Sequence, residues 1–237
     1  MLSVVIPAWN EEKNVGRYPT ELLPVLETIG MPFEVLIVDD GSMDDTARLG
    51  AGLGPWARVV KHEQNKGLAA ALRTGFAAAR GELLVTLDAD LTFAPALIPK
   101  LLERFQLGDV DVVSGSPKLA GYGDDIPSYR VWVSHAATAV YSNLLGQRVT
   151  AVSPILRLYR TADLQHLDLA SAGFEINAEI LYCLIRRGKR VAEIPAPLTQ
   201  RIHGQSSLNY RREMVRHFKL VRRMVNWRLA NYLHARA

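Results

Sequence analysis

Two aspartates directly follow a short apolar run in the stretch Leu83-Leu84-Val85-Thr86-Leu87-Asp88-Ala89-Asp90. A continuous apolar run of this length is typical of a β-strand that is covered on both faces, as in a parallel sheet. The same pattern occurs earlier, where residues 33–38 are followed by Asp39-Asp40-Gly41-Ser42. An apolar strand with acids at its carboxyl end is therefore the repeated unit from which the fold can be predicted.

Helical segments alternate with such strands on both sides of this stretch. We expect further strands at residues 2–6, 58–62, 110–113, 155–159 and 190–194. We expect helices at residues 11–28 (interrupted near its prolines), 44–50, 68–80, 95–105, 129–145 and 174–187. The alternation predicts an α/β fold with a Rossmann-like, mostly parallel sheet flanked by helices. Ligands bind at the carboxyl ends of the strands in such sheets.

The composition fits a folded intracellular enzyme or binding protein. The chain has 237 residues, of which 49% are hydrophobic and 22% charged, enough for one α/β domain with a C-terminal appendage. Its single cysteine, Cys183, excludes an intrachain disulfide and reads as a small buried hydrophobe. The N-terminus lacks the pattern of a signal peptide, and no run of 18 or more apolar residues occurs. We expect a cytoplasmic protein that meets a membrane only at its surface, as a peripheral protein of the inner face.

The net charge of +4 is concentrated in the last segment of the chain. Residues 209–237 contain eight arginines and lysines and one acid, Glu213, so this segment carries +7 and the remainder −3. The acidic remainder and the lack of base-reading residues in the tail argue against a nucleic-acid partner.

A basic amphipathic helix is expected from residue 210. Apolar residues recur at helical spacing on one stripe: Met214, Phe218, Val221, Val225, Leu229 and Tyr232. Basic residues fall on the opposite face: Arg212, Arg216, Lys219 and Arg223. One interpretation is a helix that packs its stripe on the body and leaves its basic face in water. The other is an interfacial helix that lies on anionic lipid.

The aspartate pair after the strand has the chemistry of a divalent-cation site. Asp88 and Asp90 project from one turn, and Mg²⁺ or Mn²⁺ prefers oxygen ligands and keeps positions free for substrate phosphates. A cation there would neutralise a departing diphosphate. The sequence contains neither a P-loop nor a G-x-G-x-x-G motif after the first strand, which argues against a P-loop NTPase and a dinucleotide oxidoreductase.

Four motifs together carry a family resemblance. They are Ser3-Val4-Val5-Ile6-Pro7-Ala8-Trp9-Asn10-Glu11-Glu12, Val38-Asp39-Asp40-Gly41-Ser42, Asn65-Lys66-Gly67 and Leu87-Asp88-Ala89-Asp90-Leu91. In this order they resemble the family 2 inverting glycosyltransferases of the GT-A fold. The later part of the chain looks like the dolichol-phosphate (polyprenyl-phosphate) mannosyltransferase branch, through segments such as Phe174-Glu175-Ile176 and Arg201-Ile202-His203-Gly204-Gln205-Ser206.

The resemblance implies roles for individual residues. Pro7, Trp9 and Glu11 would line the nucleotide pocket, and Val38 and Asp40 would meet the base and ribose. Asp88, Ala89 and Asp90 would hold the Mg²⁺ or Mn²⁺ ion and the diphosphate, with Thr92 as a further metal ligand. Arg201 would face phosphate, and Arg130 would face an acceptor phosphate. Asp88, Asp90, Arg130 and Arg201 would thus be the catalytic set.

These roles divide the chain into a GT-A domain at residues 1–208 and the basic amphipathic helix at residues 209–237. Within the domain, residues 1–114 form the nucleotide-sugar-binding half and residues 115–208 the acceptor-side half. The acceptor side departs from the mannosyltransferase pattern, which usually has an arginine at the place of Pro117, an acid within the 151–156 segment and a lysine at the place of Ser207.

The absence of a typical general base bears on the identity of the acceptor. Family members that glycosylate a hydroxyl often carry a Glu-Asp pair as general base, and no Glu-Asp pair follows Asp90. Glu175 and Glu179 are candidate bases whose spacing also fits a buried helix edge. A lipid phosphate is already anionic and needs no base. We therefore expect transfer of a hexose, mannose first, from GDP-mannose or a UDP-hexose to polyprenyl or dolichyl phosphate. The alternatives are a soluble tailoring enzyme that acts on a hydroxyl of a small molecule or peptide, and a non-catalytic nucleotide-sugar-binding protein.

Overall fold

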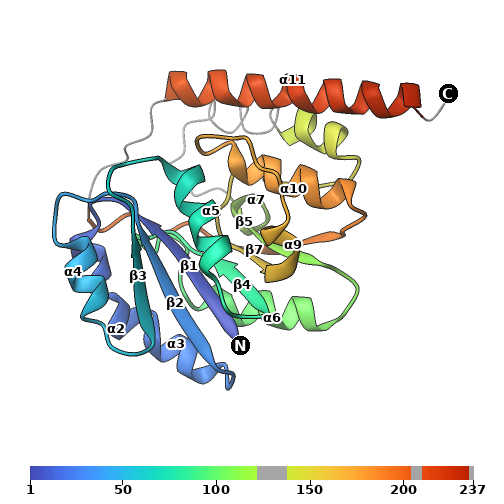
Figure 1. Ribbon diagram of the computed structural model, residues 1–237. Helices are drawn as coiled ribbons and strands as arrows, with labels where there is room; N and C mark the ends of the chain where they lie inside the picture. Colours follow the sequence, from blue (N-terminus) through green and yellow to red (C-terminus); the bar gives the residue numbers. More distant parts are fainter. Residues whose placement is uncertain (122–137, 204–209, 235–237) are drawn as a thin grey trace.

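The computed structural model describes residues 1–121, 138–203 and 210–234. Within these residues the strands form one seven-stranded sheet with the order β3-β2-β1-β4-β6-β5-β7 (Figure 1). The strands are β1 Leu2–Ala8, β2 Phe33–Asp39, β3 Ala57–Lys61, β4 Leu83–Thr86, β5 Val112–Ser116, β6 Arg157–Arg160 and β7 Val191–Pro195. Only β6 runs antiparallel to its neighbours among these strands, so the predicted mostly parallel α/β sheet is confirmed.

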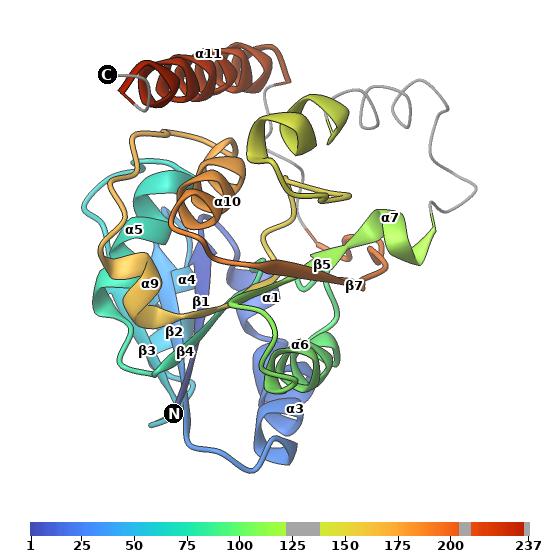
Figure 2. The same ribbon diagram turned by 90° about the vertical axis from the view of Figure 1, so that its right-hand side faces the viewer.

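Helices cover both faces of the sheet (Figure 2). One face carries α2 Tyr18–Glu21, α3 Leu23–Thr28 and α6 Leu97–Gln106, and the other carries α5 Leu68–Ala78, α9 Thr161–Gln165 and α10 Ile176–Arg186. The remaining helices are α1 Glu12–Val15, α4 Thr46–Ala51, α7 Pro117–Ala120 and α11 Tyr210–His234, and residues 138–145 are also helical. The helix expected at residues 11–28 is three short helices, because Pro19 and Pro24 each open a new one.

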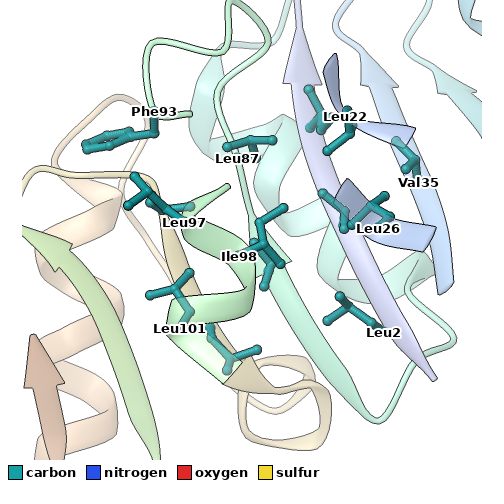
Figure 3. Close-up of a cluster of buried hydrophobic side chains, with 14 of the residues drawn as sticks. Leu2, Leu22, Leu26, Val35, Leu87, Phe93, Leu97, Ile98 and Leu101 are labelled. Carbon is teal, nitrogen blue, oxygen red and sulfur yellow. The ribbon is translucent and has the colours of Figure 1, made fainter. Parts of the chain in front are cut away.

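Alternate residues of the central strands feed two separate cores. Leu2, Val4 and Ile6 of β1 pack in the cluster beneath α2, α3 and α6, whereas Val5 packs on the opposite face beneath α5. Figure 3 shows part of the first cluster, with Leu22 and Leu26 meeting Leu2 and Val35, and Leu97, Ile98 and Leu101 nearby. Burial on both faces explains why these strands are continuously apolar.

Helix α5 lies unusually close to β1 because it carries a glycine at the contact. A Cβ on Gly75 would collide with the Val5 side chain and lie 3.3 Å from Cγ2 of Val38. This close packing fixes the N-terminus of α5, and with it the preceding Lys66-Gly67 segment, at the carboxyl ends of β1 and β2. The sheet edge that receives the predicted site residues is therefore built on rigid packing.

Helix α11 lies across the top of the molecule, above α5 and α10 (Figures 1 and 2). The residues that dock it on the body lie on the side of the helix between the predicted apolar stripe and the predicted basic face. Leu220 and Met224 are fully buried, the Trp227 ring stacks on Tyr182 of α10 at 5.5 Å, and Tyr182 Oη donates to the carbonyl of Met224 at 3.2 Å. A third contact, the ion pair between Arg223 and Glu179 at 2.7 Å, joins the same two helices.

The interpretation of a docked helix is correct in that α11 packs on the body, but most of the predicted apolar stripe does not face the body. Met214, Phe218, Val225 and Leu229 are exposed, and Phe218 keeps 71% of its surface. The docking face is held by polar contacts as well as apolar ones: Glu213, which pairs with Arg216 within α11 at 2.5 Å, accepts a hydrogen bond from the Phe174 amide of the body at 3.0 Å. In the part of the chain that the structure describes, no helix is both long and apolar enough to cross a bilayer.

Candidate active site

The turn that follows β4 carries the two aspartates of the predicted metal site. Asp90 Oδ1 accepts hydrogen bonds from the Thr92 amide at 3.0 Å and the Thr92 hydroxyl at 2.5 Å, and its Oδ2 lies 2.6 Å from Nη2 of Arg201. Asp88 has weaker support: apart from its interaction with Asp90, its two oxygens accept long bonds of 3.3 and 3.4 Å from the Phe93 amide. The negative charge of Asp90 is thus well stabilised by hydrogen bonds and an ion pair, whereas that of Asp88 is poorly stabilised.

This imbalance separates the pKa values of the pair. Burial, together with the adjacent Asp90, raises the pKa of Asp88 to about 8. Burial also opposes ionisation of Asp90, but hydrogen bonds from Asp88 and Thr92 and the charge of Arg201 lower its pKa below the usual range. Burial, less strongly offset, raises the pKa of nearby Glu11.

Arg201 reaches Asp90 because the segment after β7 folds back along the turn. Leu198 forms an antiparallel bridge with Phe93, and Thr199 donates from both its amide and its hydroxyl to the carbonyl of Thr92, at 2.9 and 3.0 Å. The same guanidinium lies 3.9 Å from Glu11. Arg201 therefore bridges the carboxyl ends of β1 and β4.

The loop after β1 is interlocked with the loop after β2. Asn10 has a left-handed backbone (φ 55°), which is rare for a residue other than glycine, and its side chain accepts from the Met43 amide at 2.9 Å. The Glu11 amide donates to the Thr46 hydroxyl at 2.8 Å. Pro7, the residue paired with Val38 in the sheet, is half-buried at this edge, and Trp9 is exposed. The predicted nucleotide-pocket residues that follow or end β1 thus share one edge of the sheet with the Asp88-Ala89-Asp90 turn after β4.

Asp40 holds the loop that precedes α5. Its carboxylate accepts from the amides of Lys66 at 2.9 Å and Gly67 at 2.7 Å, and lies 2.6 Å from Nδ1 of His62. Gly41 (φ 73°) lets this loop approach, because a Cβ there would press on the backbone of residues 64 and 65. Asp40 is thus well supplied with hydrogen bonds from the protein itself.

Asp39, its neighbour, is less well satisfied. One oxygen accepts from the Ser42 amide at 3.1 Å, while Oδ2 is buried, accepts no hydrogen bond from the residues that the structure describes, and lies 4.0 Å from the amine of Lys61. Val38 is fully buried beneath α5, so only its main chain is left to contact a nucleotide. The role of Asp40 at the base and ribose, which the family resemblance implies, stays a prediction, and Asp39 is a second candidate at the same strand end.

The turn after β4 has the properties that a hard divalent cation requires. Three acids, Glu11, Asp88 and Asp90, lie at this edge, and Arg201 contacts the carboxylates of Glu11 and Asp90. Asp88 in particular is buried with little compensation, and a cation would relieve that cost. Among residues 1–121, 138–203 and 210–234, no group of three His, Cys, Asp or Glu side chains forms a complete metal site. Two carboxylates suit Mg²⁺ or Mn²⁺, which keep several positions for water and substrate oxygens.

Comparison with known proteins identifies the family. The profile of glycosyl transferase family 2 matches residues 3–168, which include the loops after β1, β2 and β4. The chain belongs to glycosyl transferase family 2. It is 31% identical over 235 residues to a dolichol-phosphate mannosyltransferase of Pyrococcus furiosus, covering 95% of this chain. It is also 31% identical over 217 residues to an undecaprenyl-phosphate 4-deoxy-4-formamido-L-arabinose transferase of Edwardsiella ictaluri, covering 86%. The chain spans 64% and 62% of the length of these two curated relatives.

Solved structures confirm the GT-A-like architecture of this family 2 member. A glucosyl-3-phosphoglycerate synthase of Mycobacterium tuberculosis, crystallised with Mn²⁺, UDP and phosphoglyceric acid, superposes with a TM-score of 0.71 at 22% identity. The match covers 95% of this chain and 77% of that one. The α/β fold and the family resemblance predicted from the sequence are both confirmed.

Of the two acids expected as alternative bases in this family 2 chain, Glu179 is engaged elsewhere through both oxygens, whereas Glu175 has one buried oxygen, Oε2, that accepts no hydrogen bond from the described residues. Glu179 is fully buried, accepts from the amides of Ala170 and Ser171 at 3.2 and 2.8 Å, and pairs with Arg223 of α11. Glu175 lies at the start of α10 and accepts from the Ala172 amide at 2.9 Å. Both occupy the buried helix edge that their spacing also allowed. Arg130, predicted to face the acceptor, lies outside the described residues.

Arg157 is a structural group of the acceptor side that the sequence did not single out for this role. It is completely buried and donates to the Ser114 hydroxyl at 3.1 Å and to the carbonyls of Asn177 and Val152 at 2.6 and 2.7 Å. It therefore ties β5, β6 and α10 to the 151–156 segment. The partners of Arg157 come from three separate segments of the chain, and no local sequence pattern predicts that they meet.

Proposed function

We propose that this protein transfers a hexose, mannose in the first instance, from GDP-mannose or a UDP-hexose to a polyprenyl or dolichyl phosphate, with inversion at the anomeric carbon. The observation that carries the proposal is the cluster at the carboxyl edge of the sheet, in which Arg201 contacts Asp90 and Glu11 and buried Asp88 lies beside Asp90. Membership of glycosyl transferase family 2 supports the reaction class.

The donor half is assigned to the loops after β1, β2 and β4. Asp88 and Asp90 would hold Mg²⁺ or Mn²⁺, and Thr92, whose hydroxyl bonds Asp90, would complete or orient this set. The bound cation would neutralise charge on the departing nucleoside diphosphate. Pro7, Trp9 and Glu11 would border the nucleotide. Val38 and Asp40 would meet the base and ribose, and Asp39, whose Oδ2 accepts no hydrogen bond from the described residues, is a further candidate for the same role.

The acceptor half is proposed to bind a phosphate. Both relatives carry a polyprenyl phosphate in their names, dolichol-phosphate in one and undecaprenyl-phosphate in the other. An anionic phosphate oxygen can attack without losing a proton, so it requires cations for positioning and no general base. Arg201 supplies one cation beside the metal turn, and Arg130 is proposed to supply another. The engagement of both oxygens of Glu179 in the α10 region supports this acceptor.

The exposed face of α11 is proposed to lie on anionic lipid, where such an acceptor would reside. Met214, Phe218 and Leu229 are exposed there, and Arg211 and Arg222 are exposed on the same helix. Apolar side chains that enter the headgroup region, with arginines beside them, are the features of an interfacial helix. Peripheral attachment to the inner face of a cytoplasmic membrane follows as part of the proposal.

A transfer assay tests the proposal. The protein is incubated with Mn²⁺, radiolabelled GDP-mannose or UDP-glucose, and a short polyprenyl phosphate, and the organic phase is counted. We expect a lipid-linked sugar that is absent with EDTA and with Asp90→Asn. Product only on a soluble hydroxyl acceptor would replace the proposal by a tailoring enzyme. Metal-dependent binding of nucleotide without product on either acceptor would indicate a nucleotide-sugar-binding protein.

A further inference from the structure

Two side chains of the first helical region hold the metal turn through its main chain. Tyr18, the first residue of α2, is fully buried and its hydroxyl donates to the carbonyl of Ala89 at 2.9 Å. Arg17, immediately before α2, donates from Nη1 to the carbonyl of Asp90 at 3.0 Å. Both bonds therefore end on the backbone of the Asp88-Ala89-Asp90 motif.

The turn needs such support because its own conformation is unfavourable. Leu91, the next residue, has a left-handed backbone (φ 56°), which is strained for a side chain of this type. Asp88 and Asp90 also bring two carboxylates together in a partly buried place. Without external hydrogen bonds, both effects favour a different turn, in which the two carboxylates would move apart.

Arg17 is itself fixed in place. Its Nε and Nη2 pair with the two oxygens of Glu21 at 2.7 and 2.8 Å, and its Nη1 also donates to Oδ1 of Asn14 at 3.0 Å. Asn14 is buried, and its Nδ2 donates to Oε2 of Glu11 at 2.5 Å. A continuous chain of hydrogen bonds therefore joins the Glu11 carboxylate to the backbone of Asp90.

We propose that Tyr18 and Arg17 are positioning residues for the divalent-cation site: they fix the separation and direction of the two aspartates without touching the metal. This rests on the proposed function, which assigns the metal to Asp88 and Asp90. Groups that orient metal ligands from outside commonly change metal affinity by 10- to 100-fold when removed. Tyr18 acts from a buried position and Arg17 from the rim, and neither appears in the motifs that carry the family resemblance.

Tyr18→Phe is the most selective variant, because it removes one hydroxyl and keeps the buried ring. Tyr182→Phe is its matched control: Tyr182 is also buried, and its hydroxyl also donates to a main-chain carbonyl, that of Met224 in α11. Arg17→Lys is a second variant, which retains the positive charge and loses the forked geometry that reaches Glu21, Asn14 and Asp90 together. A purely structural role for the Tyr18 hydroxyl predicts that the two phenylalanine variants behave alike.

The readout is the dissociation constant for Mn²⁺, followed by water-proton relaxation, with Mn²⁺ alone and with Mn²⁺ plus UDP or GDP. We expect binding to weaken about tenfold in Tyr18→Phe and in Arg17→Lys and to stay unchanged in Tyr182→Phe. Wild-type affinity in both Tyr18→Phe and Arg17→Lys, with clear Mn²⁺ binding by the wild type, would overturn the inference and leave the proposed function intact. If the wild type itself binds no Mn²⁺ with either nucleotide, the metal-dependent function fails and the inference fails with it.

Discussion

Nη2 of Arg201 lies 2.6 Å from Oδ2 of Asp90, so a guanidinium contacts one of the two carboxylates of the metal motif. The contact spans the sheet, because it depends on the bridge between Phe93 and Leu198 that brings the segment after β7 back to β4. In the metal-free protein, Arg201 is the positive group that contacts the Asp90 carboxylate. The same guanidinium is the group that we assign to phosphate, so it has two anionic partners that compete for it.

Replacing Arg201 should therefore separate metal binding from turnover. In Arg201→Gln we expect Mn²⁺ to bind about 2- to 10-fold more tightly, because a competing cation at a partly exposed site has been removed. We expect turnover to fall by about 10²-fold or more, because a charge that stabilises the reacting phosphates is lost. Relaxation titration and the transfer assay measure the two effects. The control is Arg48→Gln, which breaks a comparable 2.7 Å pair with Asp45 on the exposed surface. Unchanged turnover in Arg201→Gln would show that this guanidinium does not serve the reaction.

Asp88→Asn should stabilise the metal-free protein while abolishing its response to metal. The folded protein raises the pKa of Asp88 from 3.8 to about 8, so it favours the neutral carboxyl. A raised pKa means that the folded state binds the proton more tightly than the unfolded state, and stability is lost as the pH rises through about 8. In EDTA at pH 8.5, the variant should gain roughly 1–3 kcal/mol in free energy of unfolding. The gain should shrink at pH 6.

Urea unfolding with EDTA or Mn²⁺ at the two pH values checks this prediction. The wild type should recover stability when Mn²⁺ is added, and Asp88→Asn should not, because only the wild type supplies the carboxylate. Thr86→Val, a substitution in the same strand away from the carboxylates, controls for general effects on β4, although it removes a buried hydrogen bond to the carbonyl of Ile155. A variant less stable than the wild type at pH 8.5 would mean that the Asp88 carboxylate is compensated in the folded state after all.

The donor edge could be predicted from the sequence because its signals are local. Each strand is a short apolar run, and in a parallel sheet the residues that follow such runs arrive at one edge. Asp88 and Glu11 could be brought together on that basis alone. The contact of Arg201 with Asp90 could not, since it depends on a bridge between distant segments. Helix periodicity predicted α11 but left its docking face open, because a docking face that contains Glu213, Arg216 and Arg223 is recognisable only through partners such as Glu179 and the Phe174 amide.

The exposed stripe of α11 makes a direct prediction about lipid binding. Phe218→Glu should weaken binding to vesicles that contain anionic phospholipid at least tenfold, because it removes a large apolar contact and adds a charge that the surface repels. Vesicle flotation at low and high salt measures this binding. The part of the binding that high salt removes is the electrostatic contribution of the arginines. Leu107→Glu is a matched control, since Leu107 is exposed to 72% and Phe218 to 71%, and Leu107 lies at the end of α6. Equal loss of binding in the two variants would remove α11 from the proposal.

The docked side of α11 should respond to acid through His217. The Nδ1 atom of His217 lies 2.6 Å from the Tyr141 hydroxyl, and Glu175 and Glu213 are the charged groups that face the ring from α10 and α11. Burial lowers the pKa of His217 below 6.5, and the two glutamates offset only part of this effect. A lowered pKa means that the unfolded state binds the proton more tightly. Stability should therefore fall as the pH drops below about 6.5, by at most about 1.4 kcal/mol per pH unit.

His217→Gln should flatten this dependence, because glutamine can bond Tyr141 without titrating. Urea unfolding at pH 7.5, 6.5 and 5.5 gives the slope, and His166→Gln, at an exposed histidine after α9, should leave it as in the wild type. Hydrogen exchange then locates the effect: acid should loosen α11 and the adjacent helix at residues 138–145 before it loosens the central strands, since His217 lies between those two helices. If the slope survives in His217→Gln, the acid-sensitive group lies elsewhere, and the attachment of α11 rests on its apolar contacts and on the Arg223–Glu179 pair.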